Sequence, residues 1–466
     1  MSTPDLTPPP TSPAAPKRQL TLFDSTSIIM GIIIGAGIYE TSPLIAKNVA
    51  GPGWLYCVWL LGGLLSLVGA LCYAELATAY PKQGGDYVYL TRAFGRAPGF
   101  LFAWSQLWVV RPGSIGAMAY IFARYANQLW PLSNQIGECF ALMAYAAAAV
   151  IVLSGINIVG VWEGKWTQNL LTTVKVLGLL AIVVAGLWFG SRNPLPRPAL
   201  AAGGTAFSLA DFGFAMILVL FTYGGWNEMA FVGAEVRDPK KNILRALVLG
   251  TVSVTVVYLL VTFAFVYALG FDGTRGSGAV AADVLKLGRG DWGARIISLL
   301  ICISALGAIN GMIFTGARIY YAMGTEHRLY ALLGRWSRGL GTPVWSLGIQ
   351  AAITLVLVVG FGLLTGGAFQ SMIEFTTPIV WIFFLLVGLS VFALRVREPD
   401  TPRPYRVPGY PVTPLLFCLT SLYMLYSSLA YTLQQGSHEP VWAVVLMLIG
   451  VAFCFYDPPP KGPEAD

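Results

Sequence analysis

Long apolar stretches follow one another along almost the whole chain, and short polar connections separate them. An α-helix of roughly 20 apolar residues crosses the hydrocarbon core of a bilayer. The sequence therefore predicts twelve transmembrane helices, near residues 22–48, 54–80, 98–125, 139–159, 166–190, 208–233, 242–271, 291–321, 344–364, 369–395, 411–433 and 440–456. This pattern is typical of an all-α polytopic membrane protein. A β-barrel would show shorter segments of alternating character.

The composition agrees with this class. Of the 466 residues, 56% are hydrophobic and only 11% are charged, whereas about 25% of the residues of a soluble protein are charged. Residues 1–19 and 457–466 are rich in proline and polar residues, and they are predicted to be disordered tails.

Lys and Arg are distributed unevenly over the predicted connections. Most of the 29 lie in the amino-terminal tail and in the connections on its side of the membrane. Cytoplasmic connections carry such an excess, so both termini are expected in the cytoplasm. The net charge of +7 mostly reflects this bias, and we expect no nucleic-acid partner.

Two of the predicted helices are interrupted at their centres. The first reads MGIIIGAGIYETSP, with Gly35, Ala36 and Gly37 at the interruption, and the sixth is interrupted at residues 222–225. Five helices separate their starts, so a second five-helix unit would be inverted relative to the first. Paired interruptions of this kind indicate the binding site of a secondary transporter. The alternative is that the glycines only allow close helix packing.

An interrupted helix leaves backbone groups without partners, which is costly in lipid. The chain tolerates this where the freed groups have a function. The N-terminus of a half-helix offers N–H groups and a positive dipole end to an anion, and the C-terminus of another offers carbonyls to a cation. A cavity flanked by both ends suits a zwitterion such as an amino acid.

Several longer stretches are similar to one family. They are GIIIGAGIY in the first helix, LCYAELATAYPKQGGDYVYLTRAFG at 71–95, VVRPGS in the third helix, FTYGGWNEMAFVGAEVRDPKKNILRAL around the sixth, GAINGMIFTGARIYYAMG in the eighth and RPYRVPGYPVTP before the eleventh. Together they resemble the L-type amino-acid transporter branch of the amino acid–polyamine–organocation superfamily. The resemblance implies a LeuT-type fold, with inverted five-helix repeats at 20–190 and 208–395, broken first and sixth helices, and two trailing helices at 411–456.

The resemblance also implies sodium-independent transport of L-amino acids by alternating access, through exchange or facilitated uptake. Proton-coupled symport is the alternative mechanism. A channel would favour a continuous polar pore, and an enzyme would need reactive side chains gathered at one depth; the sequence favours neither. The two histidines, His327 and His438, are placed in loops, so we expect no metal site and no cofactor.

The resemblance can be carried over residue by residue. The substrate-binding residues that it implies are Ile32, Ile33, Gly35, Ala36, Gly37, Phe221, Thr222, Gly224, Asn227 and Trp381. The backbone at 35–37 would hold the substrate carboxylate, and Phe221 would close over the substrate. The ammonium would meet carbonyls near Ile32, Ile33, Phe221 and Thr222. The family usually carries a serine where this chain has Ala36, so one hydroxyl contact is missing.

A charged residue inside a transmembrane helix is costly, so it is expected to have a partner or a function. Lys175 in the fifth helix costs about 2.5–3.5 kcal/mol on insertion scales, and the resemblance favours a built-in cation that bridges carbonyls of the first and eighth helices. The alternative is a lysine that extends to the membrane surface. Glu75 and Arg111 are expected in structural polar networks. Glu40 follows the first break, and it could face the cavity and favour a cationic side chain or point to solvent.

Animal members of the family use a cysteine in the loop between the third and fourth helices to bond a partner. The matching loop, QLWPLSNQIGE, contains none. No disulfide-linked heavy chain is therefore expected. We expect a multi-pass protein of the plasma membrane, in particular of a bacterial inner membrane.

Overall fold

The structure is a computed structural model that describes residues 18–192, 209–289, 291–365, 368–435 and 438–456. Its first half contains α1 (Leu22–Ile33), α2 (Gly37–Lys47), α3 (Pro52–Ala79), α4 (Asp86–Phe94), α5 (Arg96–Ser105), the π-helix η1 (Gln106–Val110), α6 (Arg111–Leu129), α7 (Ser133–Ile136), α8 (Glu138–Val159) and α9 (Val161–Arg192). Its second half contains α10 (Leu209–Thr222), the 3₁₀-helix η2 (Trp226–Glu235), α11 (Pro239–Gly276), α12 (Val280–Arg289), α13 (Asp291–Glu326), the 3₁₀-helix η3 (Arg328–Tyr330), α14 (Val344–Leu364), α15 (Ala368–Arg397), α16 (Val412–Gln435) and α17 (Glu439–Tyr456).

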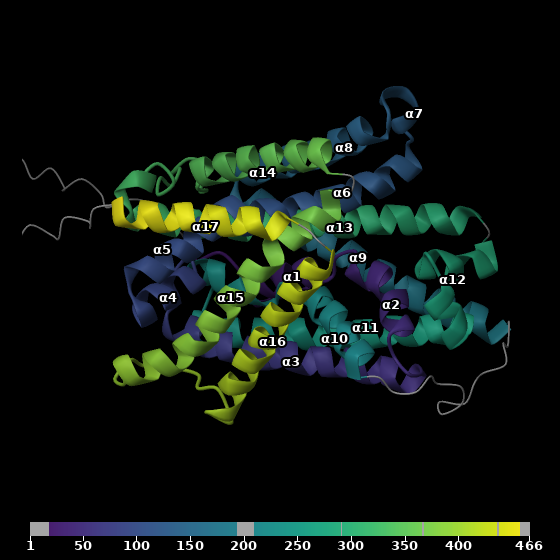
Figure 1. Ribbon diagram of the computed structural model, residues 1–466, viewed down its shortest axis with the longest axis horizontal. Helices are drawn as coiled ribbons and strands as arrows, with labels where there is room; N and C mark the ends of the chain where they lie inside the picture. Colours follow the sequence, from purple (N-terminus) through teal and green to yellow (C-terminus); the bar gives the residue numbers. More distant parts are fainter. Residues whose placement is uncertain (1–17, 193–208, 290, 366–367, 436–437, 457–466) are drawn as a thin grey trace, which may run out of the picture.

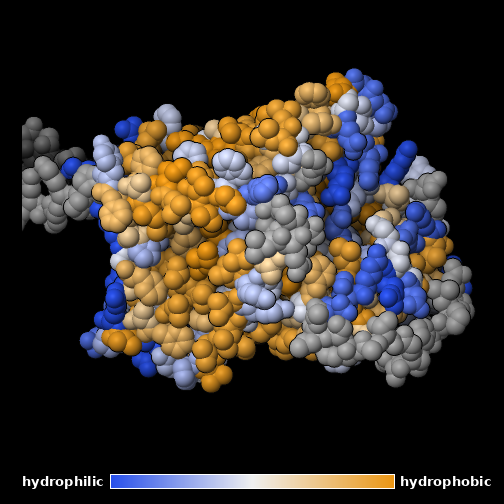
Figure 2. Space-filling model, viewed as in Figure 1, coloured by the Kyte–Doolittle hydropathy of each residue, from blue (hydrophilic) through white to orange (hydrophobic). Residues whose placement is uncertain are grey.

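The fold is an all-α polytopic membrane protein. Ten helical stretches within the described residues are long and apolar enough to cross a membrane, or eleven if the bent pair α1 and α2 is one span. Figure 2 shows hydrophobic side chains over the middle of the molecule and hydrophilic ones gathered toward the two ends of its longest axis. Lipid accounts for this exposed apolar surface, because hydrocarbon does not penalise it.

The predicted third span, 98–125, is divided in the structure. It consists of α5, the π-helix η1 and α6 in direct succession. The π-turn ends where Arg111 begins α6, so a charged residue and a change in helical winding lie at one point of the span. π-helical turns occur mostly as single bulges inside α-helices, frequently at functional sites. The hydrophobic pattern predicts the span but does not indicate this division.

Long helices from distant parts of the chain pack against one another (Figure 1). α13 packs against α6, α9 and α1, and α11 packs against α3, α9 and α1. α15 and α16 contact each other and cross the front of the view in Figure 1. α4 and α5 lie at one end of the molecule, and α12 lies at the other. The predicted tails fall outside the described residues except for positions 18 and 19.

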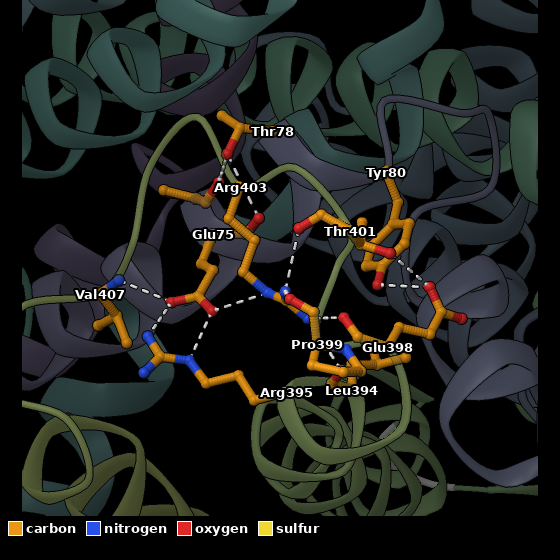
Figure 3. A network of polar contacts seen from close by, with 11 residues as sticks. Glu75, Thr78, Tyr80, Leu394, Arg395, Glu398, Pro399, Thr401, Arg403 and Val407 are labelled. Carbon is orange, nitrogen blue, oxygen red and sulfur yellow. Dashed lines mark hydrogen bonds and ion pairs between the residues drawn. The ribbon is translucent and has the colours of Figure 1, made fainter.

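A buried carboxylate joins the end of α3 to the segment after α15. Glu75 accepts hydrogen bonds from Arg395 Nε at 2.8 Å and Nη2 at 2.6 Å, and from the backbone N–H of Val407 at 2.6 Å. Arg403 Nε lies 3.6 Å from the same carboxylate, and its Nη2 donates to the carbonyls of Leu394 and Glu398. Figure 3 shows these side chains converging on Glu75. Glu75 therefore lies in a structural polar network, as expected, and this network links α3 to the segment after α15.

We expect Glu75→Ala to lower the free energy of unfolding by about 3 kcal/mol, because the buried Arg403 guanidinium and the Val407 N–H lose their acceptor. Asp272→Asn is the matched control, since that carboxylate is 86% exposed and 3.9 Å from its partner Arg275. Exposed pairs of this kind contribute about 0–1 kcal/mol. Unfolding in detergent measures both variants. Equal stabilities would contradict a structural role for Glu75.

Candidate functional site

The first helical break is short and sharply bent. α1 ends at Ile33, α2 begins at Gly37, and the axes of the two helices differ by 49°. No side chain caps the start of α2, and the described residues make no hydrogen bond to the N–H groups of Ala36 and Gly37. The break therefore presents unpaired donors at the positive end of a helix dipole.

The second break depends on a left-handed glycine. α10 ends at Thr222, and Gly225 has φ 110° and ψ −4°, a conformation that is unfavourable for other residues. The chain continues as the 3₁₀-helix η2 and not as the α-helix that the apolar pattern predicts. A 3₁₀ run of this length is uncommon, and such stretches within a span often mark a hinge.

The two breaks contact each other closely. A Cβ atom at Gly225 would lie 2.6 Å from Cγ2 of Ile32, and one at Gly37 would lie 2.9 Å from Cγ2 of Thr222. The hydroxyls of Thr41 and Thr222 are 3.0 Å apart. Glycine at 37 and 225 therefore allows the approach of the two backbones as well as the change of direction.

A cavity of about 230 Å³ lies between the breaks. All ten residues that the resemblance implies line it, namely Ile32, Ile33, Gly35, Ala36, Gly37, Phe221, Thr222, Gly224, Asn227 and Trp381. The structure therefore brings together residues from α1, α2, α10, η2 and α15. Phe221 remains 37% exposed at the cavity wall.

The carbonyl groups at the end of α1 have unequal surroundings. Tyr258 donates to the carbonyl of Ile33 at 2.9 Å, and the Ser304 hydroxyl donates to that of Ile34 at 2.8 Å. Within the part of the chain that the structure describes, no hydrogen bond reaches the carbonyl of Ile32. The first break thus leaves an acceptor, as well as donors, available at the cavity.

Lys175 lies beside the first break and not at a membrane surface. Its Nζ donates to the carbonyls of Gly31 at 2.7 Å and Ile34 at 2.8 Å in and after α1, and to that of Ser304 at 2.9 Å in α13. The side chain is 1% exposed. A lysine with three carbonyl acceptors satisfies all three of its donors and holds a positive charge between α1 and α13.

Glu40 lies one turn into α2 and does not line the cavity. Its Oε1 accepts a hydrogen bond from Tyr125 at 2.6 Å, and the side chain is partly exposed. The described structure therefore connects Glu40 to α6 beside the first break. The pairing joins residues 85 positions apart in sequence, which no local pattern indicates.

Three charged residues that sequence reasoning did not assign to the site also line the cavity, namely Asp86, Arg111 and Glu228. Arg111 was expected in a structural network, and it does pair with Glu228 at 2.8 Å. Asp86 lies in a predicted connection, and its proximity to the cavity depends on how α4 packs. A glutamate inside the apolar sixth span was the available signal for Glu228.

Comparison with known proteins places this chain among membrane transporters. The amino acid permease family profile matches residues 20–453. The b(0,+)-type amino acid transporter 1 of Mus musculus is 29% identical over 94% of this chain and 88% of its own length. The serine/threonine exchanger SteT of Bacillus subtilis (strain 168) is 30% identical over 89% and 91%, respectively. The large neutral amino acids transporter small subunit 2 of Mus musculus is 30% identical over 94% and 81%.

We expect Gly225→Ala to destabilise the protein by about 2–4 kcal/mol, because it combines left-handed strain with a collision against Ile32. Gly270→Ala is the matched control: Gly270 also has a positive φ, 74°, but an added Cβ meets no atom within 4 Å. Its ψ of 169° places it in a region open almost only to glycine, where strain alone predicts about 1–3 kcal/mol. Thermal unfolding in detergent compares the two variants. Equal losses would show that the two breaks do not constrain each other.

Proposed function

Because this chain belongs to the amino acid permease family, we propose that it is a sodium-independent secondary transporter of L-amino acids. It works by alternating access, as an exchanger or a facilitator. The relatives named above include an exchanger and two transporters of amino acids, each aligned over most of its length. Proton-coupled symport is not favoured by these relatives.

One observation carries the proposal: two broken helices border the same cavity, and the first break leaves opposite kinds of backbone group free. The N–H groups of Ala36 and Gly37 suit a carboxylate, and the Ile32 carbonyl suits an ammonium. Both ends of an amino-acid zwitterion can then be held without an ionised side chain from the protein. Phe221 and Trp381 add aromatic surface for the substrate side chain.

Lys175 supports independence from sodium. A sodium ion at this point would need oxygen ligands, and the carbonyls of Gly31, Ile34 and Ser304 already accept from the ammonium. We propose that Lys175 permanently supplies the positive charge that stabilises the end of α1. No external cation is then required to complete the site.

We further propose the organisation that the resemblance implies. Residues 20–190 and 208–395 form two inverted five-helix repeats, and residues 411–456 form the two trailing helices. The distribution of Lys and Arg favours cytoplasmic termini. We place the protein in a plasma membrane, specifically a bacterial inner membrane. The connection from α6 to α8 has no cysteine before Cys139, which favours transport without a disulfide-linked heavy chain.

Counterflow tests the function. We expect liposomes that contain the purified protein and a high internal concentration of one L-amino acid to accumulate the same labelled amino acid without sodium. Gly35→Leu should abolish this accumulation, because the leucine side chain fills the cavity. The protein should still insert normally, since an added Cβ at Gly35 has space, 3.7 Å from Met118 Sδ. Gly155→Leu is the control, since Gly155 is exposed on α8 and has no atom within 4 Å of an added Cβ. Normal uptake by Gly35→Leu would refute the site.

We expect Lys175→Met to reduce the counterflow rate at least about tenfold. Methionine is similar in length to lysine but has no ammonium, so three carbonyls beside the break lose their charged donor. Lys286→Met, at a half-exposed lysine of α12, is the control and should transport normally. A Lys175→Met protein with unchanged kinetics, still independent of sodium, would assign Lys175 a purely structural role.

A further inference from the structure

Three charged side chains line the cavity and are not needed to hold the zwitterion. Asp86 begins α4, Arg111 begins α6, and Glu228 lies in the first turn of η2. These three side chains come from elements far apart in sequence, and all three line the cavity. Each is less than a tenth exposed, so their charges are shielded from bulk water.

The Arg111 guanidinium is already occupied. Its Nη1 lies 2.8 Å from Oε2 of Glu228 and 3.4 Å from the Thr315 hydroxyl, and its Nε donates to Gln106 at 3.1 Å. The guanidinium also lies over the ring of Phe231, 5.0 Å from the centroid. Arg111 therefore neutralises the carboxylate of Glu228, and among the described residues only its Nη2 remains without a partner.

The two carboxyl groups retain free acceptor atoms. Oε2 of Glu228 accepts from Arg111 and from Thr315, but Oε1 has no hydrogen-bond partner in the described residues. Asp86 is 1% exposed: Oδ2 accepts from Tyr73 at 2.8 Å, and Oδ1 is buried without a partner. A buried acceptor without a donor is costly unless a ligand supplies one.

The charges do not balance. Two carboxyl groups face one guanidinium, so the ionised cluster carries one excess negative charge. A single cation is what the cluster lacks. Because these groups line the same cavity as the two breaks, a long substrate side chain can bring a cation to them while the backbone groups hold the zwitterion.

We propose that Asp86 and the free oxygen of Glu228 form a subsite for the cationic side chain of a basic amino acid. The inference rests on the proposed function and names its substrate class. An ammonium or guanidinium donates to Asp86 Oδ1 and Glu228 Oε1 and removes the excess charge. An acidic side chain is repelled, because the charge of Arg111 is already neutralised by Glu228.

A proton competes with the substrate cation for Asp86. Burial, together with the negative charge of Glu228, raises the pKa of Asp86 to about 8, although the Tyr73 hydroxyl and the charge of Arg111 oppose the shift. Tyr89 is a further titratable neighbour on α4. The arginines on the other helices that pack against α4, namely Arg96, Arg318 and Arg395, bind His327, Glu235 and Glu75. Below pH 8 Asp86 is mostly protonated, so a basic substrate must displace the proton.

The test uses proteoliposomes and three probes: L-lysine, L-glutamate and the neutral amino acid that shows the fastest counterflow. We expect L-lysine to be carried and L-glutamate to stay at background. Asp86→Asn should lower the ratio of L-lysine to neutral counterflow at least tenfold, and Asp86→Glu should restore most of it. Asp272→Asn, at the exposed carboxylate, should leave the ratio unchanged.

The pH dependence gives a second readout that does not need a variant. From pH 6 to 7.5 the apparent affinity of the wild-type protein for L-lysine should rise by up to about tenfold per pH unit, as expected for one displaced proton. The affinity for the neutral amino acid should not follow this slope. Neutral counterflow without L-lysine transport would overturn the subsite, and so would an unchanged ratio in Asp86→Asn. If no amino acid shows counterflow, the proposed function itself fails.

Discussion

The structure depends on one constraint: a peptide group inside the hydrocarbon core must have a hydrogen-bond partner. Continuous helices meet this constraint within themselves, and the two breaks do not. At the first break the protein supplies partners from distant helices, with Lys175 on α9, Tyr258 on α11 and Ser304 on α13. The groups that remain without partners face the cavity. The function proposed for the chain follows from these unpartnered backbone groups.

The same constraint explains why the breaks occur together. The free backbone groups of an isolated break would need side chains as hydrogen-bond partners. Here the backbones of the two breaks lie close together, because Gly37 and Gly225 have no side chain. Both breaks therefore border one cavity, where the first break offers donors at the positive end of the α2 dipole and an acceptor at the negative end of the α1 dipole. It also couples α1 and α2 to α10 and η2, so a displacement of one pair changes the contacts of the other.

Much of this arrangement could be predicted from the sequence, because it depends on local features. Glycines within apolar helices indicated the breaks, and apolar length indicated the helices. The π-turn at Gln106–Val110 and the 3₁₀ form of η2 could not be predicted in this way, since packing and not composition selects among helix types. Asp86 escaped notice because its segment reads as a connection, and the partner of Glu40 is visible only when α2 and α6 are placed side by side.

The buried ion pairs restrict where the molecule can open. Glu235 at the end of η2 binds Arg318 at 2.8 Å and Gln83 at 2.9 Å, and its carbonyl accepts from the backbone at Leu20. Glu75 and its arginines join α3 to the segment beyond α15 in the same way. Separating such pairs leaves buried charges unpaired, which costs more than separating apolar side chains. Opening on this side of the cavity must therefore be compensated by contacts that form only when a substrate is bound, and a zwitterion that satisfies the free backbone groups of the first break supplies contacts of this kind.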